Sequence, residues 1–456
     1  RRRHTRWNCD WSSDVCSSDL AMPVAAEADV CVVGGSCTGV FAAVRAARMG
    51  ASVVLVEKTN CFGGMATNGL VLIWHSLLDT EHRARIIAGL TGEVIERLDM
   101  RGAVEKKSGS HDLAFLLNTE ELKIELDALI IEHRILPMLH TLGCAPLMDN
   151  GRIRAVAVEN KDGRAAVTAK VFVDATGDGD IAVRAGVPCV AKKHLQPPTM
   201  CAKILGFRRN GVNFGELYRQ HAAEFGLERD SGWDCPVPGL PGISMAAQTH
   251  VFGINAASAS DLTRGEMEGR RQIRAIMDML RKYGGGDPPV LVQLASALGV
   301  RDTRTLRAAY CLTEEDVLNG VRFHDAVANG SYRVDVHAPD GGGFLFKYLD
   351  GRLLWVHHEG CREGRWRPET DRNPTFYQIP YRCLFHPSVP NLLFAGRCIC
   401  ADEGAFGAIR VMVNANQTGE AAGTAAAIAS RSGKNVQDVD PRSLREALAE
   451  GGSVIL

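Results

Sequence analysis

Ala28-Asp29-Val30-Cys31-Val32-Val33-Gly34-Gly35-Ser36-Cys37-Thr38-Gly39 is the stretch that decides the fold of this chain. Its first half is rich in β-branched residues and predicts a strand that ends at the glycines. Apolar residues then recur at helical spacing, at Val40, Ala43, Val44 and Ala47. Gly50 is a helix stop, and residues 52–56 predict a second strand that ends at Glu57. This pattern is typical of a β-α-β unit.

The glycine turn and Glu57 together favour a dinucleotide-binding role for this unit. Glycines let the backbone approach a pyrophosphate, the helix N-terminus offers free N–H groups, and an acid about 20 residues further on accepts bonds from ribose hydroxyls. Ser36 stands at the middle position of the G-x-G-x-x-G pattern and is small enough to fit there. An acid at position 57 favours FAD or NAD over NADP. The alternative is a glycine turn that only joins a strand to a helix.

Length, composition and charge exclude several classes of protein. The 456 residues are 46% hydrophobic and 23% charged, which is typical of a globular chain and not of a disordered protein or a membrane bundle. A net charge of -1 offers no basic field for nucleic acid, and no apolar run reaches the ~20 residues of a transmembrane segment. The 14 cysteines include no CxxC pair, so we expect reduced thiols and no metal site. The expected partner is a small molecule.

Residues 1–20 read unlike the rest of the chain. They show neither helical nor strand periodicity, and residues 11–19 supply no apolar core for a signal peptide. The segment resembles translated vector read-through, so we expect a non-native or disordered tail. The true N-terminus is then missing and an export signal cannot be read. We otherwise expect a cytoplasmic protein.

Further motifs follow the first unit in a fixed order. They are the Gly-Gly segment at 58–69, a strand and glycine turn at 171–180, a strand and turn at 391–397, the segment 405–412, and a helix rich in small residues at 419–427. With these motifs the chain resembles the FAD-dependent oxidoreductases of the glutathione-reductase-type Rossmann superfamily, which are related to the fumarate reductase and succinate dehydrogenase flavoprotein group. The resemblance covers residues from about 27 to 430.

The resemblance implies an α/β fold, namely a Rossmann-like FAD-binding domain with a three-stranded β-meander and an inserted α+β substrate or cap domain. Turns at 150–151 and 161–163 already predict the meander. The FAD-binding domain is expected to comprise residues 21–195 and 385–435, and the cap domain residues 196–384. Residues 436–456 are expected to form a C-terminal extension.

The same resemblance implies which residues bind FAD. They are Gly34, Gly35, Ser36, Thr38, Gly39, Glu57, Lys58, Gly63, Gly64, Met65, Ala66, Thr67, Ala175, Gly177, Asp178, Gly396, Arg397, Phe406, Gly407 and Ile409. The FAD is expected to be noncovalent, because residues 58–62 offer no histidine tether.

Three arginines are the catalytic candidates. Arg301 and Arg304 in the cap could clamp a substrate carboxylate bidentately, and Arg410 could stabilise reduced flavin. The alternative is that they form salt bridges or pack at the seam between domains. His75, His337 and Tyr381 are interpreted as packing residues rather than catalytic groups, and Cys398 and Cys400 as core thiols on a strand.

The expected activity is two-electron hydride transfer between FAD and a small organic substrate, and the arginines favour one that carries a carboxylate. Neither a second nucleotide motif nor an iron–sulfur motif occurs, so a separate electron carrier or acceptor is expected, with transient binding of NAD(P)H in the cap as the alternative. The alternatives are a protein that binds FAD or another dinucleotide without redox turnover, and a thiazole-synthase-like enzyme that uses NAD.

Overall fold

The computed structural model describes residues 22–107, 113–208, 212–227, 232–338, 342–357 and 360–456. The expected tail, residues 1–20, lies outside these described residues.

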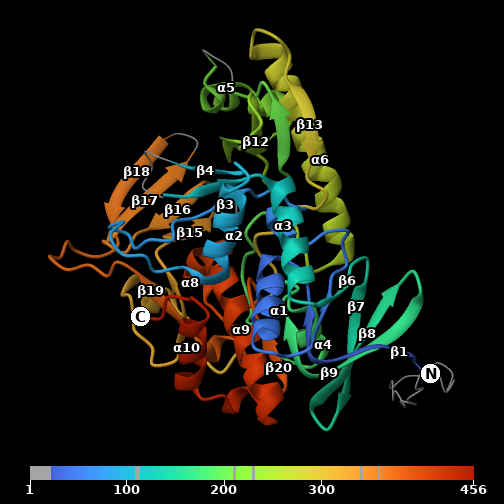
Figure 1. Ribbon diagram of the computed structural model, residues 1–456. Coiled ribbons are helices and arrows are strands. Elements are labelled where there is room, and N and C mark those ends of the chain that lie inside the picture. Colours follow the sequence, from blue (N-terminus) through green and yellow to red (C-terminus); the bar gives the residue numbers. More distant parts are fainter. Residues whose placement is uncertain (1–21, 108–112, 209–211, 228–231, 339–341, 358–359) are drawn as a thin grey trace.

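A parallel sheet forms the centre of the nucleotide-binding part (Figure 1). Its strands are β6 (Leu136–Met138), β2 (Val53–Val56), β1 (Val24–Val33), β9 (Gly163–Asp174) and β20 (Leu392–Phe394), in that spatial order. All four neighbouring pairs run parallel. The β-branched run of the sequence is buried in β1, as expected for a strand covered on both faces. This arrangement confirms the predicted Rossmann-like α/β fold.

The predicted meander extends from the same sheet. β7 (Leu142–Asp149) and β8 (Arg152–Asn160) pair antiparallel with one another, and β8 pairs with the first half of β9. The connecting turn holds Asn150 and Gly151 with positive φ angles of 48° and 75°, as the sequence pattern predicts. β9 therefore belongs to both the meander and the parallel sheet.

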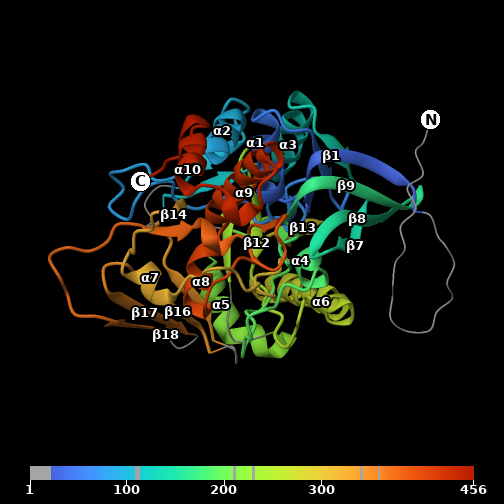
Figure 2. The same ribbon diagram turned by 90° about the horizontal axis from the view of Figure 1, so that it is seen from below.

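Helix α1 (Cys37–Arg48) and helix α9 (Met412–Ser432) lie side by side in both views (Figure 1, Figure 2). A Cβ on Gly419 would lie 2.1 Å from the carbonyl oxygen of Thr38, and one on Gly423 would lie 2.0 Å from that of Ala42. The small residues of α9 thus allow backbone-to-backbone contact between helices. This contact sets Gly419 of α9, two turns after the helix start, opposite Thr38 at the start of α1.

A second body has its own apolar core. Its antiparallel sheet has the order β11 (Trp233–Pro236), β12 (Ile243–Ala247), β10 (Ala202–Leu205) and β13 (Val290–Leu294). The long helix α6 (Ala259–Tyr283) contributes buried residues such as Ile276 and Leu280 to this core, together with helix α5 (Phe214–His221) and residues 70–73.

A third group of strands lies beside the first core. β15 (Val334–His337), β16 (Phe344–Lys347), β17 (Arg352–His357) and β18 (Gly360–Arg365) form an antiparallel meander. The remaining elements are β14 (Ala326–Gly330) paired with β19 (Tyr377–Pro380), β3 (Ile73–Trp74), β4 (Val104–Lys106), β5 (Phe115–Leu117), α2 (Gly89–Asp99), α3 (Thr119–Glu132), α4 (Asp180–Arg184), α7 (Glu314–Leu318), α8 (Glu403–Ile409) and α10 (Pro441–Glu450), with short 3₁₀ turns at Gly64–Ala66, Ala222–Phe225, Tyr381–Cys383 and Val436–Asp438.

Residues from different expected domains share one apolar core. Residues of the expected cap after position 300, such as Leu306 and Tyr377, pack into the same core as β1 and α9. In the expected C-terminal extension, Leu444 and Leu448 of α10 are buried in that core too, and Arg45 donates a 3.0 Å hydrogen bond to the carbonyl oxygen of Leu448. The division into cofactor and cap domains stays a prediction.

Among the described residues, no helix combines the length and the apolar composition that crossing a bilayer requires.

Candidate functional site

The loops that follow the parallel strands meet at one edge of the large sheet. Because β1, β2, β9 and β20 are parallel, their carboxyl ends share this edge. The chain runs from β1 through α1 to β2 on one side, whereas β9 lies on the other side of β1. The edge between β1 and β9 is therefore the topological switch point, where open α/β sheets bind their ligands.

Glycines bring backbone segments together at this switch point. Gly34 has a φ of +103°, and a Cβ there would lie 2.4 Å from the carbonyl oxygen of Ala175. A Cβ on Gly39 would lie only 1.8 Å from the carbonyl oxygen of Gly34. One on Gly35 would lie 2.6 Å from the Phe62 ring. The turn is thus built from backbone that larger residues would push apart.

Helix α1 begins directly at this turn. Its N-cap is Ser36, whose Oγ accepts a hydrogen bond from the Gly39 N–H at 3.4 Å, and its first turn holds no acidic residue. The first N–H groups of a helix lack intrahelical acceptors and carry partial positive charge. Thr38, also predicted to bind the cofactor, is buried in this first turn. The helix start suits an anionic group.

The Gly-Gly segment lies against the same turn. Gly63 N–H donates a 2.8 Å hydrogen bond to the carbonyl oxygen of Gly35, and a Cβ on Gly64 would lie 2.8 Å from the Ser36 Cβ. Met65 and Ala66 follow in a short 3₁₀ turn. The buried Thr67 hydroxyl donates to the carbonyl oxygen of Phe62 at 2.7 Å. The tertiary structure therefore brings the two glycine segments of the sequence into direct contact.

Glu57 ends the second strand with a buried carboxylate. Its Oε2 accepts a 2.6 Å hydrogen bond from the Gly35 N–H, and its Oε1 accepts bonds from the Thr59 N–H at 2.8 Å and the Thr59 hydroxyl at 2.7 Å. An ionised carboxylate has about four acceptor positions, so capacity is left for a ligand hydroxyl. The exposed Lys58 follows directly.

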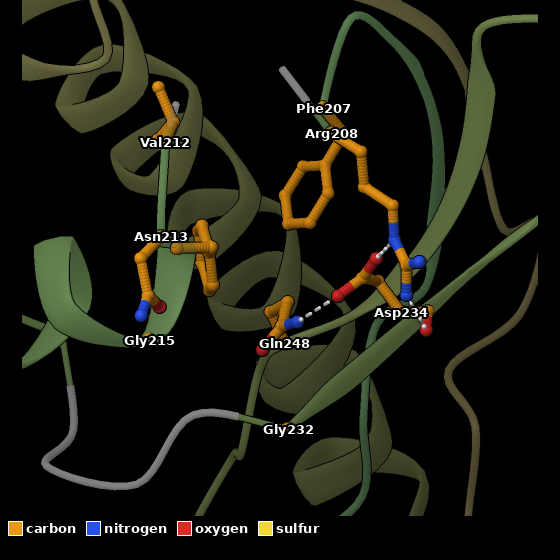
Figure 3. A pocket seen from close by; sticks show the side chains of 9 residues that line it. Phe207, Arg208, Val212, Asn213, Gly215, Gly232, Asp234 and Gln248 are labelled. Carbon is orange, nitrogen blue, oxygen red and sulfur yellow. Dashed lines mark hydrogen bonds and ion pairs between the residues drawn. The ribbon is translucent and has the colours of Figure 1, made fainter. Parts of the chain in front are cut away.

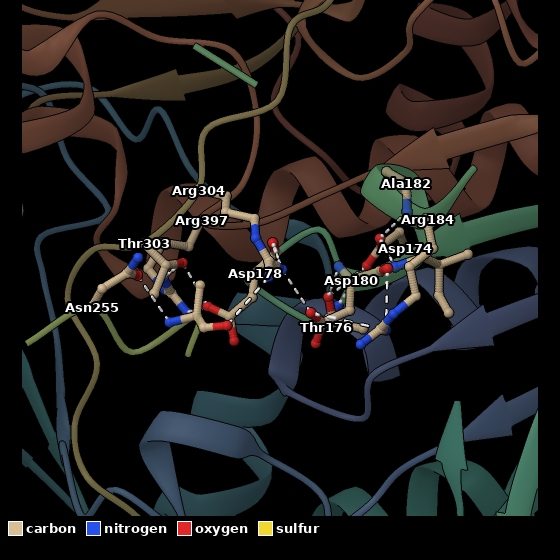
Figure 4. A network of polar contacts seen from close by, with 12 residues as sticks. Asp174, Thr176, Asp178, Asp180, Ala182, Arg184, Asn255, Thr303, Arg304 and Arg397 are labelled. Atoms are coloured by element: carbon tan, nitrogen blue, oxygen red, sulfur yellow. Dashed lines mark hydrogen bonds and ion pairs between the residues drawn. The ribbon is translucent and has the colours of Figure 1, made fainter. Parts of the chain in front are cut away.

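The loops after β9 and β20 are joined by an ionic network (Figure 4). Arg397 donates a 2.6 Å hydrogen bond to Asp178 and a 2.8 Å bond to the Thr303 hydroxyl, which itself donates to Asp178 at 2.6 Å. Burial raises the pKa of Asp178, but the Arg397 charge and the Thr303 hydrogen bond outweigh it, so this pKa lies below its ordinary value. The network also contacts Gly177, because a Cβ there would lie 3.2 Å from the Arg397 guanidinium.

Arg304 is held in the same network (Figure 4). Its guanidinium donates a 2.8 Å hydrogen bond to Asp180, and 3.3 Å bonds to the main-chain oxygens of Asp178 and Ala257. These contacts correspond to the alternative interpretation of this arginine as a residue of the seam between the two bodies.

Helix α8 carries Phe406, Gly407 and Ile409 to the junction with α9. All three are buried. A Cβ on Gly407 would lie 2.7 Å from the carbonyl oxygen of Asp335, so α8 lies tightly against β15. The ammonium of Lys192, which is ion-paired with Asp302, lies 4.0 Å from the centre of the Phe406 ring.

The other two arginine candidates lie close together at this junction. Arg410 follows α8 and pairs with Asp335 at 3.3 Å. Arg301 donates a 2.6 Å hydrogen bond to the carbonyl oxygen of Pro197 and another to the Thr199 hydroxyl. Burial and, next, the charge of Arg410 lower the pKa of Arg301 to about 10. Each guanidinium therefore lies within the electrostatic reach of the other.

A family model described as FAD dependent oxidoreductase matches residues 29–448. The chain belongs to this family. No curated protein matches it.

Solved structures of other flavoproteins are similar to this flavoenzyme at low identity. A geranylgeranyl bacteriochlorophyll reductase-like protein from Thermoplasma acidophilum is 11% identical, with a TM-score of 0.46 over 93% of this chain and 83% of the other. A flavin-dependent brominase is 13% identical, with a TM-score of 0.44 over 92% and 83%. An anhydrotetracycline hydroxylase from Streptomyces rimosus is 14% identical, with a TM-score of 0.41 over 93% and 66%.

The residues of the flavoenzyme fit the cofactor of its family. The glycine turn and the start of α1 suit the pyrophosphate, and Glu57 suits the adenosine ribose. At the other end of the site, α9 has neither a side-chain cap nor an acid in its first turn. Both polar atoms of the Asn416 side chain are buried there without a protein partner, which suits a polar ring edge. The individual assignments, including Gly396 in the turn after β20, stay predictions.

Sequence reasoning missed two polar groups beside the arginines, Tyr332 and Asp335, and interpreted a third, His337, as a packing residue. Asp335 accepts a 2.8 Å hydrogen bond from the Tyr332 hydroxyl, and its other oxygen is buried without a hydrogen-bond partner. His337 lies 4.0 Å from that carboxylate. Burial, followed by the charges of Arg301, His250 and Arg410, lowers the pKa of His337 well below its ordinary value. No spacing in the sequence links these residues to position 410, and only the alternation within residues 334–337 points to a strand.

The structure corrects the expectation about Cys398 and Cys400. The sequence pattern places them on a strand, but β20 ends at Phe394 and Gly396 adopts a φ of +86°, so both cysteines lie in the turn that follows. They are buried core thiols, as expected.

Tyr381 is buried and donates a 2.7 Å hydrogen bond to the carbonyl oxygen of Val436. His75 lies against Tyr332, with ring centroids 4.2 Å apart. His337 also packs against the Phe344 ring, with centroids 4.5 Å apart.

Among the described residues, no group of three His, Cys, Asp or Glu side chains could hold a metal ion.

A hollow of about 420 Å³ lies elsewhere, on the second body (Figure 3). Its lining includes Phe207, the ion pair between Arg208 and Asp234, and Gln248, which donates to Asp234 at 3.3 Å. The hollow includes no residue that the sequence assigns to the cofactor or to catalysis.

Proposed function

We propose that this flavoenzyme transfers two electrons between FAD and a small organic carboxylate that binds to Arg301 and Arg410. The proposal rests on a charge count. Among the described residues, Asp335 is the acid within ion-pair distance of either guanidinium, and His337 is neutral at pH 7 because its pKa is lowered. Two cations and one anion leave a largely buried positive charge, which is unfavourable unless an anion joins it.

The polar atoms around the cluster support an anionic ligand as well. The Arg410 Nε, which is a donor, is buried without a hydrogen-bond acceptor in the protein. A carboxylate can accept two N–H bonds from a guanidinium in one plane, which also orients it. A buried donor without an acceptor costs about 1–3 kcal/mol, so a ligand that satisfies it gains affinity.

Each residue of the cluster has a distinct task in this proposal. FAD, when bound, supplies hydride transfer. Arg301, held by the carbonyl oxygen of Pro197 and by Thr199, binds the carboxylate. Asp335 and Tyr332 keep Arg410 in place, and the surrounding rings, including Phe344, exclude water. The FAD is noncovalent and electrons pass to or from a separate carrier in this proposal.

The test measures carboxylate binding to the FAD-loaded protein through perturbation of the flavin absorbance spectrum. Acetate, benzoate and pyruvate are titrated against the native protein and against Arg301→Met and Arg410→Met. At least a tenfold rise in Kd is expected for both variants. Arg304→Met is the matched control, because its guanidinium belongs to the separate network of Asp178 and Asp180. Unchanged carboxylate affinity in the Arg301 and Arg410 variants would contradict the proposal.

The cofactor assignments are tested on the same protein. Acid precipitation should release all of the yellow colour into the supernatant, because the flavin is held without a covalent bond. Colour that stays with the precipitate would show a covalent link.

A further inference from the structure

The thiols of Cys311, Cys383 and Cys400 lie near one another, where the segment between β13 and α7 passes beside the turn after β20. Leu312 and Ala401 form a parallel bridge, in which Leu312 N–H donates to the carbonyl oxygen of Cys400 at 3.1 Å and Asp402 N–H donates to that of Leu312 at 2.9 Å. This register sets Cys311 beside Cys400. Cys383 lies near both, and its thiol also interacts with Leu312 N–H.

The Cys311 and Cys400 side chains interact directly. Each thiol is the main influence on the pKa of the other: hydrogen bonding between them lowers the pKa of Cys400 and raises that of Cys311. Neighbouring residues on paired parallel strands have Cα atoms about 5 Å apart, which lies within the range that a disulfide spans. The bridge therefore places the two cysteines in a register whose Cα separation a disulfide can span.

Exposure and position distinguish this pair from the other described cysteines. Cys311 is partly exposed, whereas Cys400 is buried. The described Cys189 and Cys361 are exposed, and Cys31, Cys37 and Cys201 are deeply buried with pKa values raised to about 12 by burial. The pair thus combines solvent access with an adjacent second sulfur.

We infer that Cys311 and Cys400 form an oxidation site for a small hydroperoxide, at which the two thiols are converted to a reversible disulfide. The function proposed above is not needed for this inference.

The chemistry balances with hydrogen peroxide as the oxidant. The thiolate sulfur attacks one peroxide oxygen, so that an S–O bond forms, the O–O bond breaks, and hydroxide leaves as water after protonation. The second thiol then attacks the sulfenic sulfur, so that the S–S bond forms, the S–O bond breaks, and a second water leaves. Two thiols lose two electrons and two protons, and one peroxide becomes two waters.

The disulfide would form next to the α8 start. Asp402, two residues after Cys400, is the N-cap of α8: its carboxylate accepts the Ala405 N–H at 2.8 Å and the Glu314 N–H at 2.8 Å. Helix α8 carries Phe406, Gly407 and, at its end, Arg410. Oxidation would covalently join the two segments that hold this helix start.

The experiment treats the full-length, FAD-loaded protein with hydrogen peroxide, then blocks free thiols and maps the peptides by mass spectrometry. A peptide pair joined through Cys311 and Cys400, 2 Da lighter than the two free thiols and lost after dithiothreitol, is expected at about one equivalent of peroxide. Exposed Cys361 and Cys189 are the internal controls, because they should give no specific partner.

Variants distinguish a specific disulfide between Cys311 and Cys400 from general thiol oxidation. In Cys311→Ser, the disulfide should disappear, and dimedone trapping of sulfenic acid at Cys400 should rise at least tenfold. Cys361→Ser is the matched control and should leave the disulfide unchanged. Cys311→Ala repeats the test if the serine variant folds poorly. Oxidation of Cys311 to sulfinic acid without a disulfide, or scrambled pairing with Cys361 or Cys189, would overturn the inference.

Discussion

Replacing Gly39 by alanine should remove FAD binding, although the change adds a single methyl group. A Cβ at this position would lie 1.8 Å from the carbonyl oxygen of Gly34, 2.9 Å from its carbonyl carbon and 3.2 Å from the Ala175 Cβ. An ordinary contact between carbon and oxygen is about 3.3 Å, so the start of α1 or the turn would have to move by about 1.5 Å. Neither neighbour is the flexible end of a side chain.

The magnitude follows from two opposing terms. Alanine is favoured over glycine in a helix by up to about 1 kcal/mol, and overpacking against rigid backbone costs about 1–3 kcal/mol or more. With the full helix-propensity gain subtracted, we expect the protein to lose about 0–2 kcal/mol of stability, or more where the backbone cannot relax. The displacement also separates the start of α1 from the turn, so FAD affinity should fall at least a hundredfold, or about 2.7 kcal/mol.

The assay is the flavin-to-protein absorbance ratio after gel filtration, together with urea unfolding of the same sample. Gly215→Ala is the matched control, because this glycine is also near a helix start, in α5, and a Cβ added there would lie 3.5 Å from its nearest neighbouring atom. The control should keep full flavin content and equal or higher stability. A Gly39→Ala protein with full flavin content and unchanged urea midpoint would refute the steric reasoning at the turn.

The other predictions concern charge. His337 has a lowered pKa when folded, so the unfolded state takes up its proton first as the pH falls below about 6.5, and this contribution to stability is lost on acidification. Burial raises the pKa of Glu420 to about 7, which acts in the opposite direction over the same pH range, so the His337 contribution is measured as a difference between proteins. The change in urea-unfolding stability between pH 7.5 and 5.5 should differ by about 1.4 kcal/mol between the native protein and His337→Asn, and it should be the same in the native protein and in a variant of the exposed His194. Arg304→Met should lower the free energy of unfolding by about 1 kcal/mol, because the bonds of Arg304 to Asp180 and to main-chain oxygens are only partly buried. Carboxylate affinity should stay intact, and a tenfold loss of affinity would show that Arg304 binds the ligand. Asp335→Asn removes the negative charge that pairs with Arg410, so dicarboxylates should gain affinity relative to monocarboxylates. The ratio of malonate to acetate affinity, measured by flavin absorbance, should rise at least tenfold. An unchanged ratio would show that the anion binds elsewhere.

Local sequence was sufficient for the nucleotide-binding half of the molecule. A β-branched run, a glycine turn, a small-residue helix and an acid at the end of the next strand are each recognisable within a short window, because their constraints come from the backbone itself. The strand ends at Val33, Val56 and Asp174 agree with this pattern. The same local view failed at Cys398 and Cys400, because the left-handed Gly396 ends the strand before them.

Local sequence alone was enough to predict the fold class and the dinucleotide-binding turn, since these depend on close backbone approaches that glycines allow, and the order of the motifs was enough for the resemblance to the family. Which charges meet depends on the packing of the whole chain. Arg301 and Arg410 are distant in sequence, and Asp335 and His337 reach them from a separate meander that no local pattern connects to the sheet. The same holds for Cys311 and Cys400, which become neighbours through one parallel bridge. The physical reason is that such contacts are set by how whole strands and helices pack their apolar faces, which a window of neighbouring residues does not contain.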